Sequence, residues 1–319
     1  KALNTNNLDD PAIALPGDYF NTNLWTGNGS TQSINVGFQP DFLWTKERAE
    51  ATYPGMRNSV TGVTKTLSSS LVNLTEQTET TGVDAFTSTG FDLDGDGYFY
   101  VNRNAKTMVG WSWKAGGTAV SNTDGSITSS VSATTTAGFS IVSYTGNGTS
   151  PSTIGHGLSV APEMVMVKNR SLANENWVVS VGNITGTNGD FLILNTDSVV
   201  IAGTSQFPSQ PGSSVFTVTN AANVNTNTNT YIAYCFHSVE GYSKVGSYKG
   251  NGSTDGSFIC TGMAPAFIMV KRTDSADNWA MYDSARDTYN VRAKYLLADS
   301  NQAEATYSTA VVDFLSNGF

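Results

Sequence analysis

The chain has 319 residues, of which 13% are charged and 39% hydrophobic, and its formal net charge is −9. This acidic balance disfavours nucleic acid as a partner, because a phosphate backbone repels a negative surface. No apolar run is long enough to predict a transmembrane helix, so no membrane insertion is expected. Ser, Thr, Asn and Gly take the place of charged residues, which favours short strands joined by turns and hence an all-β fold.

One motif occurs three times and divides the chain. An aromatic residue, one further residue and Gly-Asn-Gly are followed by Ser or Thr, starting at Trp25, Tyr144 and Tyr248. Downstream, a proline is followed after six residues by a lysine. These pairs are Pro40 and Lys46, Pro162 and Lys168, and Pro265 and Lys271. Such internal repeats predict tandem modules instead of one large domain.

The first part of the chain is predicted to be a short lead-in followed by one module. Residues 1–18 are polar, contain two prolines, and are expected to be extended. Residues 19–117 form module one, where Gly, Asn and Pro turn signals separate short apolar stretches. The predicted strands are 19–26, 33–38, 42–46, 85–91, 98–103 and 107–114. Their spacing predicts an antiparallel β-sandwich of jelly-roll or lectin-like type.

The rest of the chain repeats this plan. Residues 118–138 are rich in Ser and Thr and are interpreted as a linker with room for one short hairpin. Module two spans 139–240, and module three, 241–319, follows almost without a linker, which predicts that these two are rigidly coupled. Helix is expected to be scarce, because no stretch has a clear 3.6-residue period.

Module three is predicted to be truncated. Residues 314–319 match 86–91 of module one, but the hairpin that follows in module one has no counterpart. Either the sequence is a fragment or another chain supplies the missing strands.

The candidate metal ligands are Asp92, Asp94 and Asp96, which alternate with Leu and Gly. Spaced carboxylates of this kind resemble the first half of a calcium loop. Arg103 stands where such a loop would need its bidentate Glu. An Asp-Gly hairpin turn that holds no ion is therefore the alternative to Ca²⁺, and no other cofactor is expected.

Aromatic residues alternate along two predicted strands, Trp111 with Trp113 and Tyr234 with Phe236, so each pair lies on one face. Such a row is either a platform for sugar stacking or part of a core, and recurrence beside aliphatic strands favours the core. Three tryptophans are nevertheless kept as candidate sugar or receptor contacts: Trp44, Trp177 and Trp279.

No pattern in the sequence predicts an enzyme. There is no Gly-x-Ser-x-Gly elbow and no Cys-His arrangement with an orienting group. The acidic residues of module three interleave with Arg272 and Arg286, which favours salt-bridged loops over a carboxylate pair for glycoside hydrolysis. His156 and His237 are interpreted as ordinary surface or turn residues, and Cys235 and Cys260 as half-buried free thiols, with a disulfide as the alternative.

Several longer stretches resemble a repeat domain of unknown role found in virion structural proteins of marine bacteriophages, including cyanophages. They are 19–22 leading into 25–30, then 37–46, 111–117, 137–142, 231–238 and 270–274. Members of that family often carry Asp-Ser-x-Arg after the Pro-to-Lys strand. Module three keeps it as Asp283-Ser284-Ala285-Arg286, module one keeps only Arg57, and module two has neither. A shared active site on this element is therefore not expected.

The resemblance implies a structural or adhesive component of the virion surface. We expect a tail fibre or other appendage that binds the host surface, with a capsid decoration or knob protein as the alternative within the virion. A secreted carbohydrate-binding module or carbohydrate-active enzyme is the alternative from another class. The expected partners are other virion proteins, a host-surface glycan and further copies of the chain, with a trimer inferred from how fibres are usually built.

Overall fold

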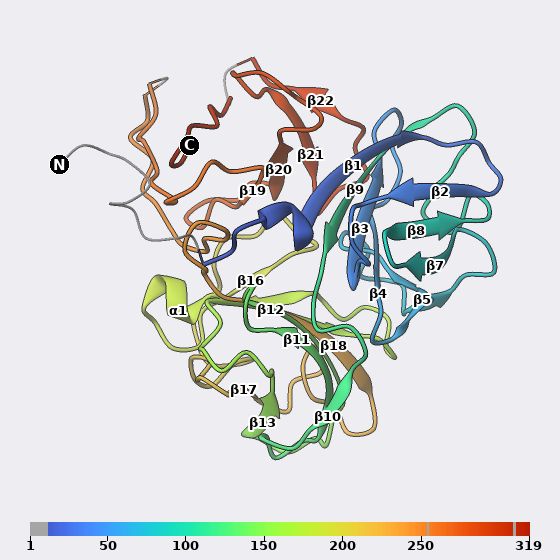
Figure 1. The fold of residues 1–319 in the computed structure, drawn as a ribbon. Coiled ribbons are helices and arrows are strands. Elements are labelled where there is room, and N and C mark those ends of the chain that lie inside the picture. Colours follow the sequence, from blue (N-terminus) through green and yellow to red (C-terminus); the bar gives the residue numbers. More distant parts are fainter. Residues whose placement is uncertain (1–11, 254, 309–310) are drawn as a thin grey trace.

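The computed structural model describes residues 12–253, 255–308 and 311–319 and has an all-β fold. Figure 1 shows three groups of strands, coloured blue to teal, green to yellow, and orange to red, that meet at the centre of the molecule. We call the corresponding parts of the chain copy one (19–117), copy two (118–240) and copy three (241–319). Most of the predicted lead-in, residues 1–11, lies outside the described residues. Pro16–Asp18 form a short 3-10 helix, η1, so this end of the lead-in is not extended as predicted.

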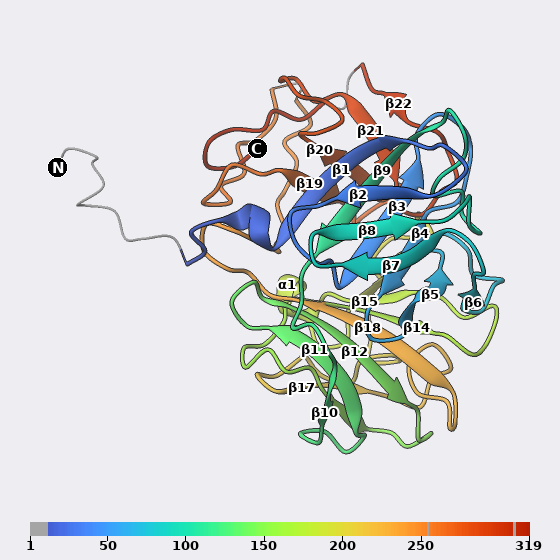
Figure 2. The ribbon, with the colours of Figure 1, turned by 45° about the vertical axis from the view of Figure 1, so that its right-hand side comes forward.

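Copy one forms an antiparallel six-stranded sheet with the order β1-β9-β3-β4-β5-β6. A three-stranded sheet, β2-β8-β7, packs on one of its faces (Figure 2). The strands are β1 (Phe20–Thr26), β2 (Gln32–Asn35), β3 (Phe42–Glu47), β4 (Gly55–Asn58), β5 (Gly62–Leu67), β6 (Gln77–Thr78), β7 (Val83–Thr87), β8 (Gly90–Leu93) and β9 (Thr107–Trp113). The strands predicted at 19–26, 33–38, 42–46 and 107–114 are confirmed with small changes of boundary. The strand predicted at 85–91 is a hairpin, and 98–103 is wrong because these residues form turns.

Copy two forms a seven-stranded antiparallel sheet with the order β10-β11-β12-β18-β14-β15-β16, and a second sheet pairs β13 with β17. The strands are β10 (Val120–Asn122), β11 (Ser129–Thr134), β12 (Phe139–Thr145), β13 (Ser152–Gly155), β14 (Met164–Asn169), β15 (Val178–Ser180), β16 (Phe191–Ile193), β17 (Val215–Val218) and β18 (Thr230–Phe236). The short helix α1 (Gly182–Thr185) follows β15. The predicted linker 118–138 instead contributes β10 and β11 to this sheet, because β11 pairs along its whole length with β12.

Copy three forms the smallest of the main sheets, with the order β19-β20-β21-β22. Its strands are β19 (Phe267–Val270), β20 (Ala280–Asp283), β21 (Lys294–Leu297) and β22 (Ala305–Thr306). The Pro-to-Lys stretches of the three copies therefore become β3, β14 and β19, and each pairs with the strand that follows it.

Both faces of each Pro-to-Lys strand lie against apolar side chains. In β14, Val165 and Val167 pack within copy two, whereas Met166 points into a cluster shared by all copies. The same alternation places Leu43 within copy one and Trp44 in the shared cluster. Because successive side chains of a strand point to opposite faces, one sequence pattern produces both contacts.

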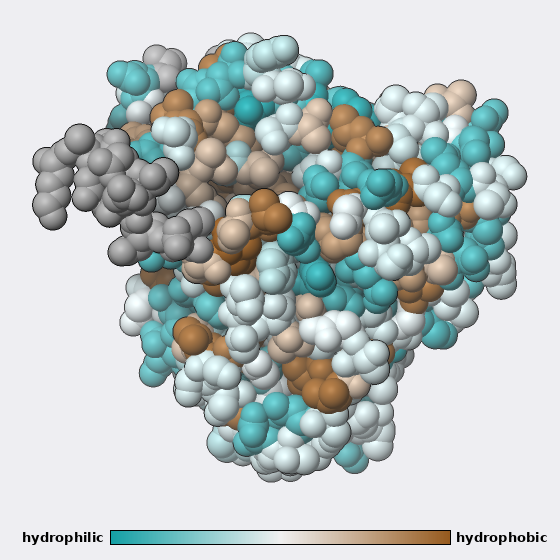
Figure 3. Space-filling model, in the orientation of Figure 1, coloured by the Kyte–Doolittle hydropathy of each residue, from teal (hydrophilic) through white to brown (hydrophobic). Residues whose placement is uncertain are grey.

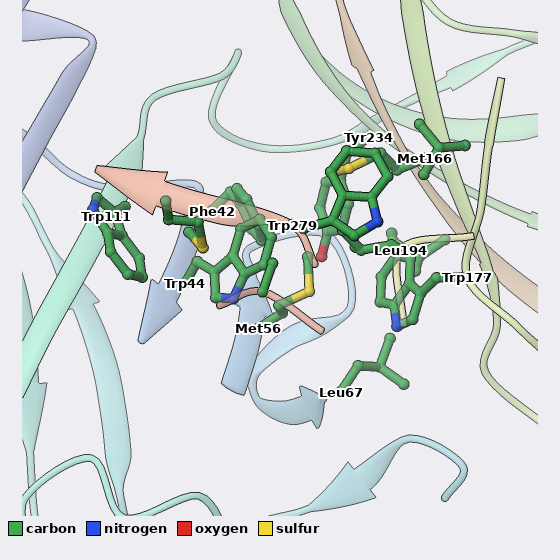
Figure 4. Packing of buried hydrophobic residues seen from close by; sticks show 14 of the residues in the cluster. Phe42, Trp44, Met56, Leu67, Trp111, Met166, Trp177, Leu194, Tyr234 and Trp279 are labelled. Atoms are coloured by element: carbon green, nitrogen blue, oxygen red, sulfur yellow. The ribbon is translucent and has the colours of Figure 1, made fainter. Parts of the chain in front are cut away.

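The shared cluster is the central core of the molecule (Figure 4). It brings Trp44, Met166 and Met281, one residue from each copy, into a single buried group. Aromatic rings of different copies are in contact there, with 4.3 Å between the ring centroids of Phe42 and Tyr234. The three sheets are thus held around one hydrophobic centre and do not form separate bodies on a string.

Backbone hydrogen bonds close these contacts into a ring. In each case a neighbouring copy donates an N–H group to the carbonyl oxygen two positions after the repeat lysine. The bonds run from Glu304 to Arg48, from Glu76 to Arg170 and from Val200 to Thr273, with lengths of 2.8, 3.0 and 2.9 Å. Copy three therefore contacts copy one, copy one contacts copy two, and copy two contacts copy three.

Replacement of Trp177 by Ala should test this arrangement. The side chain is fully buried in the shared core, so its removal is expected to lower the free energy of unfolding by about 3–5 kcal/mol. Hydrogen exchange should show weaker protection in all three sheets, because they share the core. Leu172→Ala, at a side chain 43% exposed, is the control. A loss of protection confined to copy two would contradict the shared core.

Candidate functional site

The three candidate tryptophans lie in the shared core. Trp44, Trp177 and Trp279 are 2%, 0% and 4% exposed. Two of them also donate an indole hydrogen bond to a neighbouring copy. Trp177 Nε1 donates to Ser68 O of copy one at 2.8 Å, and Trp279 Nε1 donates to Ile193 O of copy two at 3.0 Å. None of the three presents a ring face to solvent, so the surface contact with sugar or receptor predicted for them is wrong.

The candidate calcium ligands lie at the end of β8 and the turn that follows, where two of them make structural hydrogen bonds. Asp92 accepts a hydrogen bond from Ser33 Oγ at 2.6 Å, and Asp94 accepts one from Gly82 N at 2.7 Å. One carboxylate oxygen of Asp96 is buried without a partner. Within the described residues, no group of three acidic, His or Cys side chains is arranged to hold a metal ion. The local geometry is that of a closed turn, and Ca²⁺ binding there stays a prediction.

A buried polar cluster joins copy three to copy one. Arg286 Nε lies 2.5 Å from Asp283 Oδ2, and both side chains are fully buried. The Glu304 carboxylate forms ion pairs with two arginines: its Oε2 lies 3.2 Å from Arg286 Nη1, and its Oε1 lies 2.8 Å from Arg48 Nη2. Trp111 Nε1 donates to Asp283 at 3.1 Å. The Asp-Ser-x-Arg element is thus a structural joint that fixes one copy against another.

Electrostatics within this cluster favour the charged form of Glu304. Burial alone would raise the pKa of its carboxyl group, but the hydrogen bonds and positive charges of Arg48 and Arg286 together hold it below its ordinary value. The carboxylate therefore stays ionised and paired. A group in this state cannot act as a general acid near neutral pH.

Arg57, the only part of that element kept in copy one, is also buried in an ion pair. Its Nη2 lies 2.6 Å from Glu79 Oε1, with side chains 0% and 2% exposed. Sequence reasoning missed Glu79 and Glu304 as partners. Glutamates are rare in this chain, which could have drawn attention to these two. Nothing in the sequence, however, links either of them to an arginine in another strand or copy.

The three repeat lysines anchor loops through their ammonium groups. Lys46 Nζ donates to the carbonyl oxygens of Thr52 and, at 3.1 Å, Asn301 in copy three. Lys168 Nζ donates to Glu175 O, and Lys271 Nζ donates to Asp197 O in copy two at 3.0 Å. Each Pro-to-Lys strand therefore has, near its end, a lysine amine that donates hydrogen bonds to backbone carbonyls.

Burial makes two of these lysines unusually easy to deprotonate. Loss of solvation lowers the pKa of Lys46 to about 7, although the neighbouring Glu47 charge opposes the shift. The same cause lowers the pKa of Lys168 to about 8, with Glu175 opposing. A lysine of this kind can serve as a base or nucleophile, but both are directed at carbonyl oxygens beneath the surface and not into a cleft.

A surface cleft of about 500 Å³ lies between copies one and two. Tyr19, Asp41 and Lys114 are among its lining residues. The carboxylate of Asp41 is occupied by N–H donors from Ala115 at 2.8 Å and Gly117 at 3.2 Å. Lys114 Nζ stands 5.7 Å from the Tyr19 ring centroid. This cleft offers the Lys114 amine and an aromatic ring to a small polar ligand, while the Asp41 carboxylate is already engaged by backbone N–H groups.

The histidines and cysteines are not brought together. His156 and His237 are both buried, so of their interpretation as surface or turn residues the surface part is wrong. His156 is held in a turn by Gly212 O and Leu158 N, and burial lowers its pKa. Cys235 is buried and Cys260 exposed, and both are free thiols, so the disulfide alternative is excluded. Burial raises the pKa of Cys235 to about 12, which makes it a poor nucleophile.

Comparison with known proteins places the chain in a family. Residues 15–319 match the model of a domain of unknown function, DUF7483. The chain belongs to the DUF7483 family. No curated protein and no solved structure matches the chain. Membership therefore gives this fold to the family without assigning an activity. In the part of the chain that the structure describes, no helix has the length and apolar character needed to cross a bilayer.

The pH dependence of the free energy of unfolding should show the lowered pKa of Lys46. Its pKa is about 7 when folded and 10.5 ordinarily, so between these values the unfolded state binds more protons and the free energy of unfolding rises with pH. From pH 7 to 9, this rise should be about 1–2 kcal/mol smaller in Lys46→Met than in the wild type. Urea unfolding at both pH values measures it. Lys168 contributes equally to both proteins, and equal slopes would contradict the shifted pKa.

Replacement of Asp94 by Ala should separate a structural turn from a calcium site. Loss of the hydrogen bond from Gly82 is expected to destabilise the protein by about 1 kcal/mol, with or without Ca²⁺. Thermal unfolding with millimolar Ca²⁺ and with a chelator tests this. Asp84→Ala, at an exposed position of β7, is the matched control. A wild-type stability gain from Ca²⁺ that Asp94→Ala abolishes would instead favour the metal site.

Proposed function

We propose that this chain is a structural component of a phage virion surface, a tail fibre or comparable appendage with a role in adhesion. The main support is that large aromatic residues of all three repeats pack in one shared core, and that several charged groups form contacts between copies. Glu304 of copy three pairs with Arg48 of copy one. Lys46 of copy one donates to the backbone carbonyl of Asn301 in copy three. Residues used in this way stabilise a rigid body, which suits a building or binding component better than a catalyst.

The proposal includes a finer description of the fold. Each copy is a β-sandwich module of jelly-roll or lectin-like type, in which a large sheet packs on a smaller one. Separate apolar clusters between the sheets of copy one and of copy two support this reading. Such sandwiches carry loops at their ends, where binding surfaces can vary without a change in the core.

The proposed adhesive surface lies on exposed loops. Since the candidate tryptophans are buried, a host-surface glycan would have to use other aromatic residues. Tyr98 and Tyr100 in copy one are 50% and 43% exposed, and the Arg103 guanidinium lies 5.1 Å from the ring centroid of Tyr100. Exposed aromatic rings beside a cation are the kind of surface on which sugar rings stack.

Copy number in purified particles tests the proposal. Quantitative mass spectrometry against the major capsid protein should give on the order of tens of copies per particle for an appendage of cyclic symmetry. Hundreds of copies would instead favour the capsid decoration alternative. Absence from particles, together with binding of the purified chain to a glycan array, would favour the secreted carbohydrate-binding alternative and overturn the virion assignment.

A further inference from the structure

The copies can be aligned from the registers of their sheets. Asn58 lies opposite the first residue of β3, and Asp283 lies opposite the first residue of β19. Continuing the β14–β15 register by one pair places Val181 opposite the first residue of β14, so these three positions are equivalent. The strands β9 and β18 start at Thr107 and Thr230, each paired with the last residue of the first strand of its copy. The loops before β9 and β18 therefore align without a gap.

The loop before β9 is anchored in the same way as the loop before β18. In both, the aromatic residue of the Gly-Asn-Gly motif donates a hydrogen bond to a valine carbonyl oxygen. Trp25 Nε1 donates to Val101 O at 3.0 Å, and Tyr144 Oη donates to Val224 O at 2.7 Å. The next residue of each loop is a fully buried asparagine whose side chain bonds to the Gly-Asn-Gly turn. The same contacts therefore fix both loops.

Copy one carries three tyrosines where copy two has small or polar residues. Two lie in the loop before β9, and the third lies five residues before Asn58, as its counterpart lies five residues before Val181. The aligned pairs are Tyr53 and Asn176, Tyr98 and Ala221, and Tyr100 and Asn223. The three tyrosines are 40%, 50% and 43% exposed. Since copy two forms the same loop anchors without aromatic residues at these places, the fold does not require the three rings.

The two loops that carry these tyrosines lie against each other. Phe99 is 4% exposed and contacts the loop that leads into β4, where a Cβ on Gly55 would lie 3.2 Å from the Phe99 Cδ2. In copy two, the equivalent loops are bonded directly, with 2.7 Å between Asn176 N and Asn223 Oδ1. The exposed rings therefore stand on an anchored base. A ligand that binds them has less disorder to remove, which favours affinity.

A charge cluster on the same two loops also distinguishes copy one from copy two. Glu50 forms ion pairs with Arg103, at 2.9 Å, and with Lys106, and these side chains are 41%, 34% and 31% exposed. The aligned residues of copy two are uncharged: Leu172, Thr226 and Asn229. The Arg103 guanidinium lies 5.1 Å from the ring centroid of Tyr100 and 3.5 Å from Glu47. The cluster thus offers hydrogen-bond donors and acceptors beside the rings without an unpaired charge.

We propose that the three exposed tyrosines and the adjoining charge cluster form one site, the tyrosine surface, which binds a neutral oligosaccharide. Sugar rings stack on the tyrosine rings, and their hydroxyl groups bond to the paired charged groups. An anionic sugar would find no unpaired cation in the cluster and would meet a chain of net charge −9. The inference rests on the proposed adhesive function and names the ligand of that surface and the copy that carries it.

The surroundings of the rings favour a sugar over a protein partner. A stable protein interface buries about 800 Å² on each side and has an apolar centre. In the space-filling view, hydrophilic groups predominate on the part of copy one at the right, and the hydrophobic groups are small and separate (Figure 3). A few exposed rings among polar groups suit a ligand that is itself mostly polar.

Binding of defined sugars to the whole protein tests the site. The probes are linear hexasaccharides of glucose, mannose, galactose and N-acetylglucosamine, with hexagalacturonate as the acidic comparison. A neutral probe should bind saturably in titration calorimetry, at least tenfold more tightly than hexagalacturonate, and should protect 48–55 and 98–106 from hydrogen exchange. Protection confined to other segments, or tighter binding of the acidic probe, would overturn the proposal. No saturable binding of any neutral probe would also overturn it and leave the tyrosine surface to a protein partner.

Variants that carry the residues of copy two separate binding from folding. Tyr53→Asn, Tyr98→Ala and Tyr100→Asn together should weaken sugar binding at least tenfold and leave the midpoint of thermal unfolding within about 2 °C of the wild type. Tyr289→Ala, at a tyrosine 82% exposed in copy three, is the control and should bind like the wild type. Unchanged affinity in the triple variant, or an equal loss in the control, would refute the site. Neither result alters the copy number per particle, which tests the virion role separately.

Discussion

Burial of both faces of the Pro-to-Lys strand is the constraint on which the rest of the structure depends. A strand in an ordinary antiparallel sheet can leave one face to solvent, but β14 packs Val165 within its copy and Met166 into the common core. The sheets must therefore meet face to face around one centre. Once they do, Lys46 near the end of β3 and Lys168 near the end of β14 are buried too, and nearby backbone carbonyls have to satisfy their amino groups.

Some of the few charged residues of this chain are buried, and burial increases the effect of each charge on stability. An exposed ion pair contributes little to stability, whereas a buried one is costly to break because the remaining charge is left without a partner. Arg286 is paired with both Asp283 and Glu304, and Glu304 also with Arg48. These pairs add less to net stability than the apolar core, but they restrict how copy three can sit against copy one. We interpret them as the source of orientation and the core as the source of cohesion.

The sequence predicted the local plan well and the contacts between copies poorly. Repeats, turn signals and alternation located β1, β3 and β9, because those signals act over a few residues. The strands β4 and β5 were missed, since Gly55–Asn58 follows a proline and Gly62–Leu67 carries Thr and Lys without an apolar alternation. Whether Trp177 faces sugar or core depends on Ser68, more than a hundred residues earlier. No local pattern carries that information. The same holds for two of the predicted calcium ligands: Asp92 bonds to Ser33 on β2, and Asp94 bonds to Gly82 just before β7.

The equivalent positions Asn58, Asp283 and Val181 differ in chemistry although they share a place in the repeat. The amide of Asn58 meets the hydroxyl of Tyr234, and the carboxylate of Asp283 meets the indole N–H of Trp111. Exchange of these partners would leave a buried polar group unsatisfied, which costs more than the hydrogen bond itself contributes. The copies are therefore not interchangeable, and the ring can close in only one order. Because the repeats differ at these junctions, each contact between copies is a distinct interface. In a symmetric assembly of identical copies, the interfaces would be the same. Of these three positions, only Val181 has no polar side chain.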